Sequence, residues 1–256
     1  MDFGKIFSRA LKYPFNVQVF LVMLVVNLVF SYSGLYFIGL TDPVAVSTLL
    51  NLGPAIIPLV IAGIIASILV TIFLMGLYVD NASKYFSSGR KSLLSNLPTA
   101  KKKFFRLLGT YILMVMIVII SALPMVALAG IKAFSAGAGA YMPVSIGAVI
   151  GLAIMLIVLF FVSLATYIAV LDKFGILGSI KVSANVVNKN KLSMFIFWIL
   201  YLIIATALGL LSVAVLLVSV LALDIRILIL QSFITTYTTL FAYSAFTNFY
   251  LSVKKK

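Results

Sequence analysis

The sequence predicts an all-α membrane protein, and three observations lead to this class. Apolar residues make up 64% of the 256 residues and charged residues only 9%, which is far outside the composition of soluble domains. Six uncharged stretches of 25 to 39 residues are each long enough for one membrane helix, which needs about 20 residues, and too short for two helices and a turn. All six are continuously apolar, whereas barrel strands would alternate in short segments. We therefore expect one polytopic domain over residues 1–256, a bundle of six transmembrane helices.

The distribution of Lys and Arg predicts how these helices are oriented. The expected spans are residues 17–37, 54–78, 107–128, 144–170, 194–220 and 227–250. When the connections are assigned alternately to the two sides, 17 of the 19 basic residues fall on one side and 2 on the other. Basic residues collect on the cytoplasmic side of membrane proteins. We therefore expect a multi-pass protein of the cell membrane with both termini in the cytoplasm.

The first sixteen residues predict an amphipathic helix that lies on the cytoplasmic surface of the membrane, with Asp2 as its cap and Pro14 near its end. Its apolar face is expected to carry Phe3, Phe7, Ala10 and Leu11, and its polar side Lys5, Arg9 and Lys12. A secretory signal peptide is the alternative, because three positive charges precede an apolar stretch and Ser31-Tyr32-Ser33 weakly resembles a cleavage site.

The first two spans contain polar or small side chains. Asn27 would either line a path or bond a neighbouring helix, and we favour the second interpretation because a lone Asn in a bundle usually does so. In the second span Ala62, Gly63, Ala66 and Ser67 lie about one turn apart, which predicts close approach of another helix.

The connection from Tyr78 to Gly109 is the most basic part of the chain. Its interspersed Leu and Phe residues indicate short surface-bound helical pieces rather than a free linker. We expect cations of this connection and of the next cytoplasmic one to bind anionic headgroups or a membrane partner, at about 1 kcal/mol each. These residues are Lys84, Arg90, Lys91, Lys101, Lys102, Lys103, Arg106 and Lys181.

The later connections follow the same plan. Gly147 and Gly151 have the small-xxx-small spacing of tight helix crossings, within one molecule or between two, so a homo-oligomer is one alternative. Residues 171–193 predict a second interfacial helix. Its apolar face is expected to carry Leu177, Ile180, Ala184 and Val187.

The sixth span is rich in hydroxyl groups, with one stripe through Ser232, Thr236, Thr239, Tyr243 and Thr247. A polar pocket or a transport path is one interpretation. The other is that Ser and Thr bond their own backbone four residues back and that Tyr marks the membrane interface. The residues of the pocket hypothesis are Asn27, Gln231, Ser232, Thr236, Thr239 and Tyr243.

Basic-to-apolar transitions near Phe15, Phe104 and Leu192 are 89 and 88 residues apart, which suggests a three-fold repeat of a helix-hairpin unit. Each unit would hold an amphipathic inner segment, a span, an outer loop and a returning span. The returning spans end alike, with YVD at 78–80 and VLD at 170–172. These units would point the same way in the membrane, unlike inverted repeats.

The residues used in most catalysis are missing, because the chain has no Cys, His or Glu and its five Asp residues lie at termini or span ends. We therefore expect no enzymatic activity, no cofactor and no bound metal. Asp80 and Asp172 would either pair with Lys or Arg or be ordinary interface charges, which we favour. The net charge is +14, but the chain has no polar domain long enough to form a nucleic-acid-binding surface, so no nucleic-acid partner is expected.

Three segments carry a family resemblance: RALKYPFN, SSGRKSLLSNLPTAKKKFFRLLG and DKFGILGSIKVSANVVNKNKLSMFIFW. They resemble the six-span family related to the membrane domain of glycerophosphodiester phosphodiesterases and to the YciC-like uncharacterised membrane proteins. Gly89 and Arg90 match its Gly-Arg connector, and Lys181 and Ser183 match its basic helix with a central Ser, although Asn185 stands where an aromatic residue is more usual. The resemblance implies a helical membrane domain. The family's phosphodiesterase activity does not carry over, because the second domain and its His and Glu are lacking.

The leading hypothesis from the sequence is a non-catalytic membrane protein that binds anionic lipid or a membrane partner through its basic cytoplasmic face. The alternative is a transporter, channel or permease-like subunit that uses the hydroxyl-rich sixth span.

Overall fold

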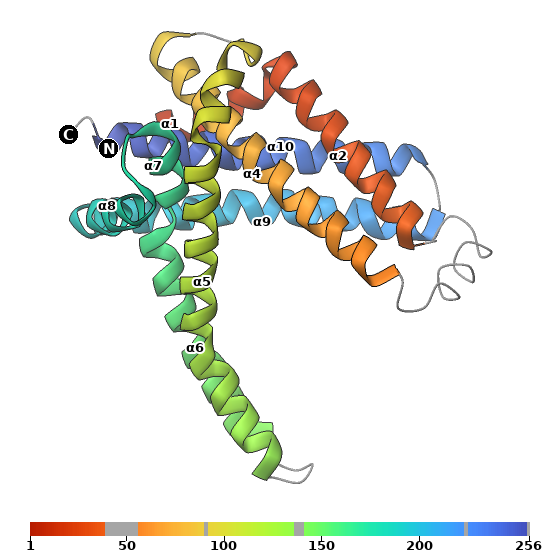
Figure 1. The fold of residues 1–256 in the computed structure, drawn as a ribbon, viewed down its shortest axis with the longest axis vertical. Coiled ribbons are helices and arrows are strands. Elements are labelled where there is room, and N and C mark those ends of the chain that lie inside the picture. The colour runs from red at the N-terminus through yellow and green to blue at the C-terminus, as the bar shows by residue number, and fades with distance from the viewer. Residues whose placement is uncertain (39–55, 90–91, 136–140, 223–224, 255–256) are drawn as a thin grey trace. The chain divides into compact units, whose positions relative to one another are not determined.

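The computed structural model of the protein describes residues 1–38, 56–89, 92–135, 141–222 and 225–254 (Figure 1). Within these ranges it describes the side chains except at 30–38, 56–57, 59–60, 124–135, 141–148, 216–222 and 225–228. All regular elements in the described ranges are helices, so the predicted all-α class is confirmed. They are α1 Phe3–Lys12, η1 Tyr13–Phe15, α2 Val17–Ile38, α4 Ile56–Ser88, η3 Leu94–Asn96, α5 Leu97–Ser135, α6 Tyr141–Val162, α7 Ala165–Leu171, α8 Ile176–Lys189, α9 Lys191–Ala222 and α10 Ile225–Lys254.

Four of these helices are long and apolar enough to cross a membrane, which supports a membrane location. The qualifying stretches are Ile61–Ser88, Leu94–Leu123, Val149–Leu171 and Lys191–Val215. A fifth would follow if Phe3–Phe15 and Val17–Val29, which meet at a bend of 69°, formed one broken span. These four correspond to the second to fifth predicted spans. Much of the first predicted span lies beyond Val29, where side chains are not described, and the described part of α10 is too polar to qualify by composition.

The contacts divide the chain into two compact units, residues 1–102 with 193–256 and residues 103–192. In the first unit α1, α2 and α4 all contact α10. Every residue of α10 from 243 to 250 is buried, so its C-terminal half is enclosed by protein on all sides. This helix is the centre of the first unit.

Aromatic side chains fill the space around the C-terminal half of α10. Phe197 of α9 is fully buried, and its ring centroid lies 4.4 Å from that of Phe249 and 5.4 Å from that of Phe7. Tyr201 of α9 stacks against Phe241 of α10. Rings of this size bury much apolar surface and prefer such offset and edge contacts. Helices α1, α9 and α10 therefore meet in one aromatic core.

The helix α4 changes character along its length. Its residues from 61 to 71 are exposed apart from the half-buried Ser67, and most are apolar, whereas residues 76–82 are all buried. The prediction that small residues of this helix pack against another helix is wrong for Ala62, Gly63 and Ala66, which are exposed among the described side chains. A side chain at Gly63 would meet open space. The exposed half presents the kind of surface that lipid would cover.

The apolar face of α1 differs from the predicted one. Its buried residues are Ile6, Phe7 and Ala10, whereas Phe3 and Leu11 are only half-buried. The reason is tertiary packing, since α1 lies against α10 and its buried face points there. Asp2 caps the helix as predicted, accepting a hydrogen bond of 2.9 Å from the backbone N–H of Lys5.

In the second unit, the predicted span 144–170 consists of two helices, because α6 ends at Val162 and α7 begins at Ala165. Ser183 of α8 bridges this interruption: its Oγ donates to the carbonyl of Phe161 at 2.8 Å and accepts from the N–H of Leu164 at 3.2 Å. Buried backbone groups that a helix leaves unpaired need such partners. One hydroxyl group therefore satisfies both sides of the break.

The buried face of α8 consists of Ser179, Ser183 and Val187, and Leu177, predicted on that face, is 74% exposed. The helix is thus rotated so that Ser183 reaches the break between α6 and α7. Gly109 of α5 leaves room for the side chain of Ile176 at the start of α8.

Replacing Ser183 with Ala should destabilise the protein by about 1–3 kcal/mol, because two buried backbone groups would lose their partner. The matched control is Ser179→Ala, since Ser179 is equally buried on the same helix but bonds only the carbonyl of Gly175, one turn back. Thermal or denaturant unfolding in detergent measures the difference. Equal losses for the two variants would contradict the bridging role of Ser183.

Candidate functional site

The basic connection is tied to α4 and η1 through the buried side chain of Asn81. Its Nδ2 donates to the carbonyl of Ser92 at 3.0 Å, and its Oδ1 accepts from the hydroxyl group of Tyr13 at 2.9 Å. Burial raises the pKa of Tyr13 well above its ordinary value, so this phenol is a neutral donor. One amide group therefore holds three segments together.

Lys84 forms an ion pair with Asp80, which is one of the two alternatives that the sequence allowed for Asp80. Its Nζ lies 2.8 Å from Oδ2 of Asp80, which is almost completely buried, and it also donates to Oδ1 of Asn96. The favoured interpretation of Asp80 as an ordinary interface charge is therefore wrong. The ammonium group of Lys84 clamps the connection onto α4.

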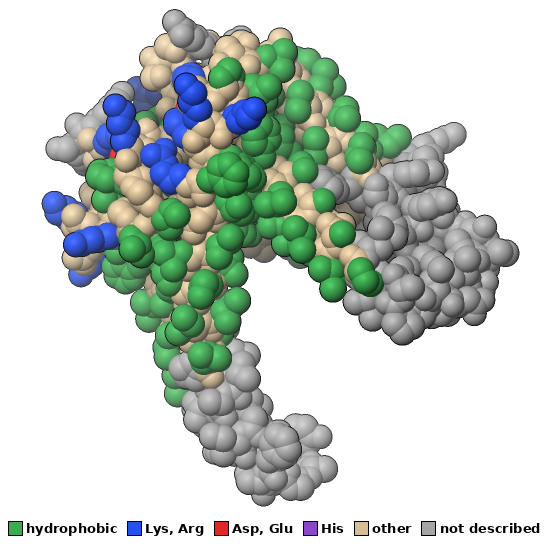
Figure 2. Space-filling model, in the orientation of Figure 1, with side chains coloured by type: hydrophobic (Ala, Val, Ile, Leu, Met, Phe, Trp, Pro, Cys, Tyr) green, Lys and Arg blue, Asp and Glu red, His purple; other side chains and the backbone are tan. Residues whose placement is uncertain are grey.

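The other predicted lipid-binding cations differ in exposure. Lys101 and Lys102 are exposed in the first turns of α5, Lys103 and Arg106 are half-buried further along it, and Lys181 is exposed on α8. Arg90 and Lys91 lie outside the described residues. From residue 107 to residue 123, the rest of α5 whose side chains are described has no Lys or Arg, and the visible face of this stretch in Figure 2 is largely apolar.

Exposed apolar side chains accompany the lysines of the connection. Leu94 is 73% exposed, Leu97 44% and Phe105 78%. Large apolar side chains next to exposed lysines are typical of a segment at a membrane boundary. There the rings and aliphatic chains enter the lipid, and the ammonium groups contact the headgroups.

Asn27 bonds a neighbouring helix, as the favoured interpretation predicts. Its Nδ2 donates to Oγ1 of Thr236 at 2.8 Å, which joins α2 to α10. Thr236 is fully buried. The two residues of the pocket hypothesis that the structure brings together are therefore paired with each other.

Three further threonines of α10 bond the backbone of their own helix. Thr238, Thr239 and Thr247 donate to the carbonyls of Ile234, Thr235 and Tyr243, each four residues back. Tyr243 is buried and its ring stacks on that of Tyr78, and Ser232 is buried while Gln231 is half-buried. This arrangement is the backbone-bonding alternative for Thr238, Thr239 and Thr247.

Three polar groups of α10 instead reach the backbone of α1. Asn248 Nδ2 donates to the carbonyl of Ile6 at 3.1 Å, Ser244 Oγ to that of Ala10 at 3.0 Å and Tyr237 Oη to that of Leu11 at 3.1 Å. The last carbonyls of a helix have no partner inside it. Ser244 and Tyr237 therefore complete the C-terminal end of α1, and Asn248 adds a bond further back along it. The hydroxyl pattern did not reveal this role because the partners are more than 200 residues apart.

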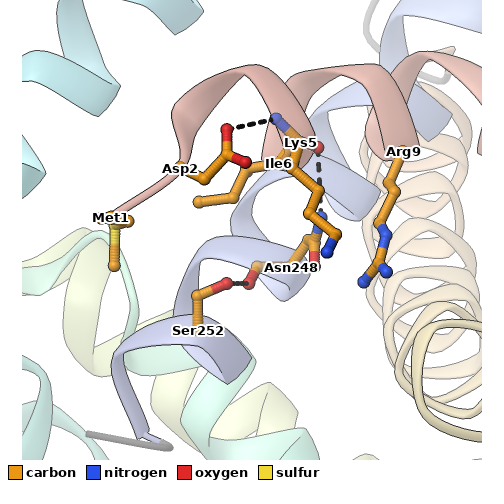
Figure 3. Close-up of a pocket in the computed structure, with 7 residues that line it drawn as sticks. All are labelled: Met1, Asp2, Lys5, Ile6, Arg9, Asn248 and Ser252. Carbon is orange, nitrogen blue, oxygen red and sulfur yellow. Dashed lines mark hydrogen bonds between the residues drawn. The ribbon is translucent and has the colours of Figure 1, made fainter.

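A pocket of about 220 Å³ lies where the start of α1 meets the end of α10 (Figure 3). It is lined by Met1, Asp2, Lys5, Ile6, Arg9, Asn248 and Ser252. The sequence placed Lys5 and Arg9 only on the polar side of a surface helix and gave no signal for Asn248 or Ser252. The described residues contain no group of three or more His, Cys, Asp or Glu side chains that could hold a metal ion.

The fold and these sites define a class: an all-helical protein with four helices able to cross a membrane. Comparisons with protein-family models, with curated proteins and with solved structures found no match.

The Asp80–Lys84 pair should be energetically coupled. We expect Lys84→Met to destabilise the protein because it leaves the Asp80 carboxylate buried without its partner, and we expect the added substitution Asp80→Asn to recover part of the loss. A double-mutant cycle of unfolding in detergent should give a coupling of about 0.5–3 kcal/mol. Lys101→Met, at an exposed lysine, is the control and should change little. A coupling near zero would show that the pair does not clamp the connection.

Proposed function

We propose that this protein is a non-catalytic, six-span membrane protein that binds anionic lipid through a basic cytoplasmic face. The observation that carries the proposal is the start of α5, where exposed Lys101 and Lys102 stand beside exposed Leu94, Leu97 and Phe105. Ammonium groups and apolar side chains on one short segment fit the boundary between headgroups and acyl chains.

Six spans require that α2 and α10 also cross the membrane. The polarity of α10 does not oppose this, because a helix enclosed by other helices faces protein rather than lipid, and the hydroxyl groups of Thr236, Thr238, Thr239 and Thr247 have hydrogen-bond partners. Its 30 residues extend for about 45 Å at 1.5 Å per residue, more than the apolar thickness of about 30 Å. The exposed Leu21, Val25 and Val29 of α2 suit contact with lipid.

The contact between α1 and α10 supports a shared side for the two termini. Ile6 pairs with Asn248 and Ala10 with Ser244, so α1 runs antiparallel to the end of α10 and the two ends of the chain lie close together (Figure 1). An even number of spans is consistent with that arrangement. The cytoplasmic assignment follows from the 17 basic residues expected on this side.

Three similar junctions support the three-fold repeat. The basic connection bonds α4 through Asn81 and Ser92, and α8 bonds the junction of α6 and α7 through Ser183. Helix α1 bonds α10 through Ser244 and Ala10. In each case an inner segment is tied by a side chain to a returning helix. The third junction joins the first inner segment to the last returning helix.

Neutralising Lys101, Lys102 and Lys103 to Gln should weaken binding of anionic lipid. At about 1 kcal/mol for each lysine near the surface, the triple variant should lose at least about tenfold in affinity. Native mass spectrometry of protein reconstituted with mixed phosphatidylglycerol and phosphatidylcholine would measure the retained lipid. Lys132→Gln, on the expected outer side, is the control. A wild-type protein that retains both lipids equally would overturn the proposal.

A further inference from the structure

The pocket between α1 and α10 holds two cationic side chains that form no ion pair with a described residue. In Figure 3 the side chains of Lys5 and Arg9 both extend from α1 toward α10. Neither side chain makes an ion pair or hydrogen bond within the described part of the chain. The one carboxylate of the pocket belongs to Asp2 and is engaged with the backbone of α1 as its cap.

The opposite wall of the pocket is polar and fixed in position. Asn248 is 5% exposed, and one N–H of its amide is held by the carbonyl of Ile6. An Asn amide has two N–H donors, so the second remains to be used by a ligand. Ser252 donates to the carbonyl of Asn248 at 2.7 Å, which places its oxygen at the rim. The hydroxyl hydrogen of Ser252 is thus engaged, and the donor that α10 adds to the two cations of α1 is the second N–H of Asn248.

The size and chemistry of the pocket suit one class of ligand. Its volume of about 220 Å³ corresponds to about seven water molecules at about 30 Å³ each, enough for a phosphoryl group and a few attached atoms. A guanidinium group binds phosphate oxygens in a bidentate manner, and an ammonium group adds a point charge. A phosphoryl group offers several acceptors to these donors, whereas a neutral ligand would leave the excess of two cations over the single Asp2 carboxylate uncompensated.

We propose that this pocket binds the phosphate of an anionic lipid headgroup. The source is a lipid rather than a soluble phosphate because α1 is expected to lie at the cytoplasmic boundary of the membrane, where anionic headgroups are concentrated. This inference rests on the proposed function for its lipid and for its place at the cytoplasmic boundary, but it uses residues other than the lysines of α5. A bound headgroup would bridge α1 and α10 and so hold the two ends of the chain together.

The test uses the full chain in detergent, with short-chain phosphatidic acid, phosphatidylcholine or inorganic phosphate as the added probe. Binding is measured by native mass spectrometry and by the shift of the unfolding temperature. Wild-type protein should bind phosphatidic acid in preference to phosphatidylcholine. The variant Lys5→Gln/Arg9→Gln should lose about tenfold or more in affinity while its unfolding temperature without lipid stays unchanged, because both side chains are exposed.

Three further variants make the result specific. Lys12→Gln removes an exposed charge from α1 outside the pocket and should bind as wild type. Arg9→Lys keeps the charge and should retain part of the affinity. Ser252→Asp places a carboxylate in the pocket and should abolish binding. This variant tests the site if the double variant proves unstable.

Each outcome decides the inference. Equal binding by wild type and by Lys5→Gln/Arg9→Gln, or equal losses with Lys12→Gln, would overturn it. Inorganic phosphate that binds as tightly as the lipid would overturn the lipid source. If neutralising Lys101, Lys102 and Lys103 weakens lipid binding and the pocket variants do not, the proposed function stands and the pocket site falls. If the reverse is found, the pocket site stands and the role of α5 falls.

Discussion

An interrupted helix leaves backbone carbonyl and N–H groups without partners, and in an apolar environment each such group must find one within the protein. Side chains from a second helix meet this requirement at two interruptions. Ser244 and Tyr237 of α10 donate hydrogen bonds to backbone carbonyls at the end of α1, and Ser183 of α8 bridges the break between α6 and α7. These three side chains are therefore explained by the backbone groups of another helix rather than by a ligand or a path.

In the first unit, the hydrogen bonds between helices lie in the same parts of α4 and α10 as the buried residues. The C-terminal halves of α4 and α10 are enclosed, while residues 61–71 of α4 present apolar side chains to the surroundings. Packed aromatic side chains, polar joints and the ion pair of Asp80 and Lys84 belong to the same end of these helices. Exposed apolar surface takes up the other half of α4. The first unit thus combines a protein-like core with a surface suited to lipid.

The sequence was sufficient for the helical class, for the cap at Asp2 and for the bond of Asn27 to another helix, because composition and local spacing determine them. It was insufficient for the break before Ala165, since hydropathy stays high across it. The buried face of α8 was missed because a serine can be buried when a broken backbone needs its hydroxyl group. Contacts between α1 and α10 join residues more than 200 positions apart, and local patterns carry no information on such pairs.

The most direct test of this account is a cross-link between α1 and α10. The chain has no cysteine, so Ala10→Cys with Ser244→Cys introduces one defined pair. Ser8→Cys with Ser244→Cys is the control, because Ser8 is exposed on α1. In native membranes under mild oxidation, the first pair should form an intramolecular disulfide and the control pair should not. Absence of a disulfide in the first pair, with both thiols accessible to alkylation, would contradict the docking of α1 on α10.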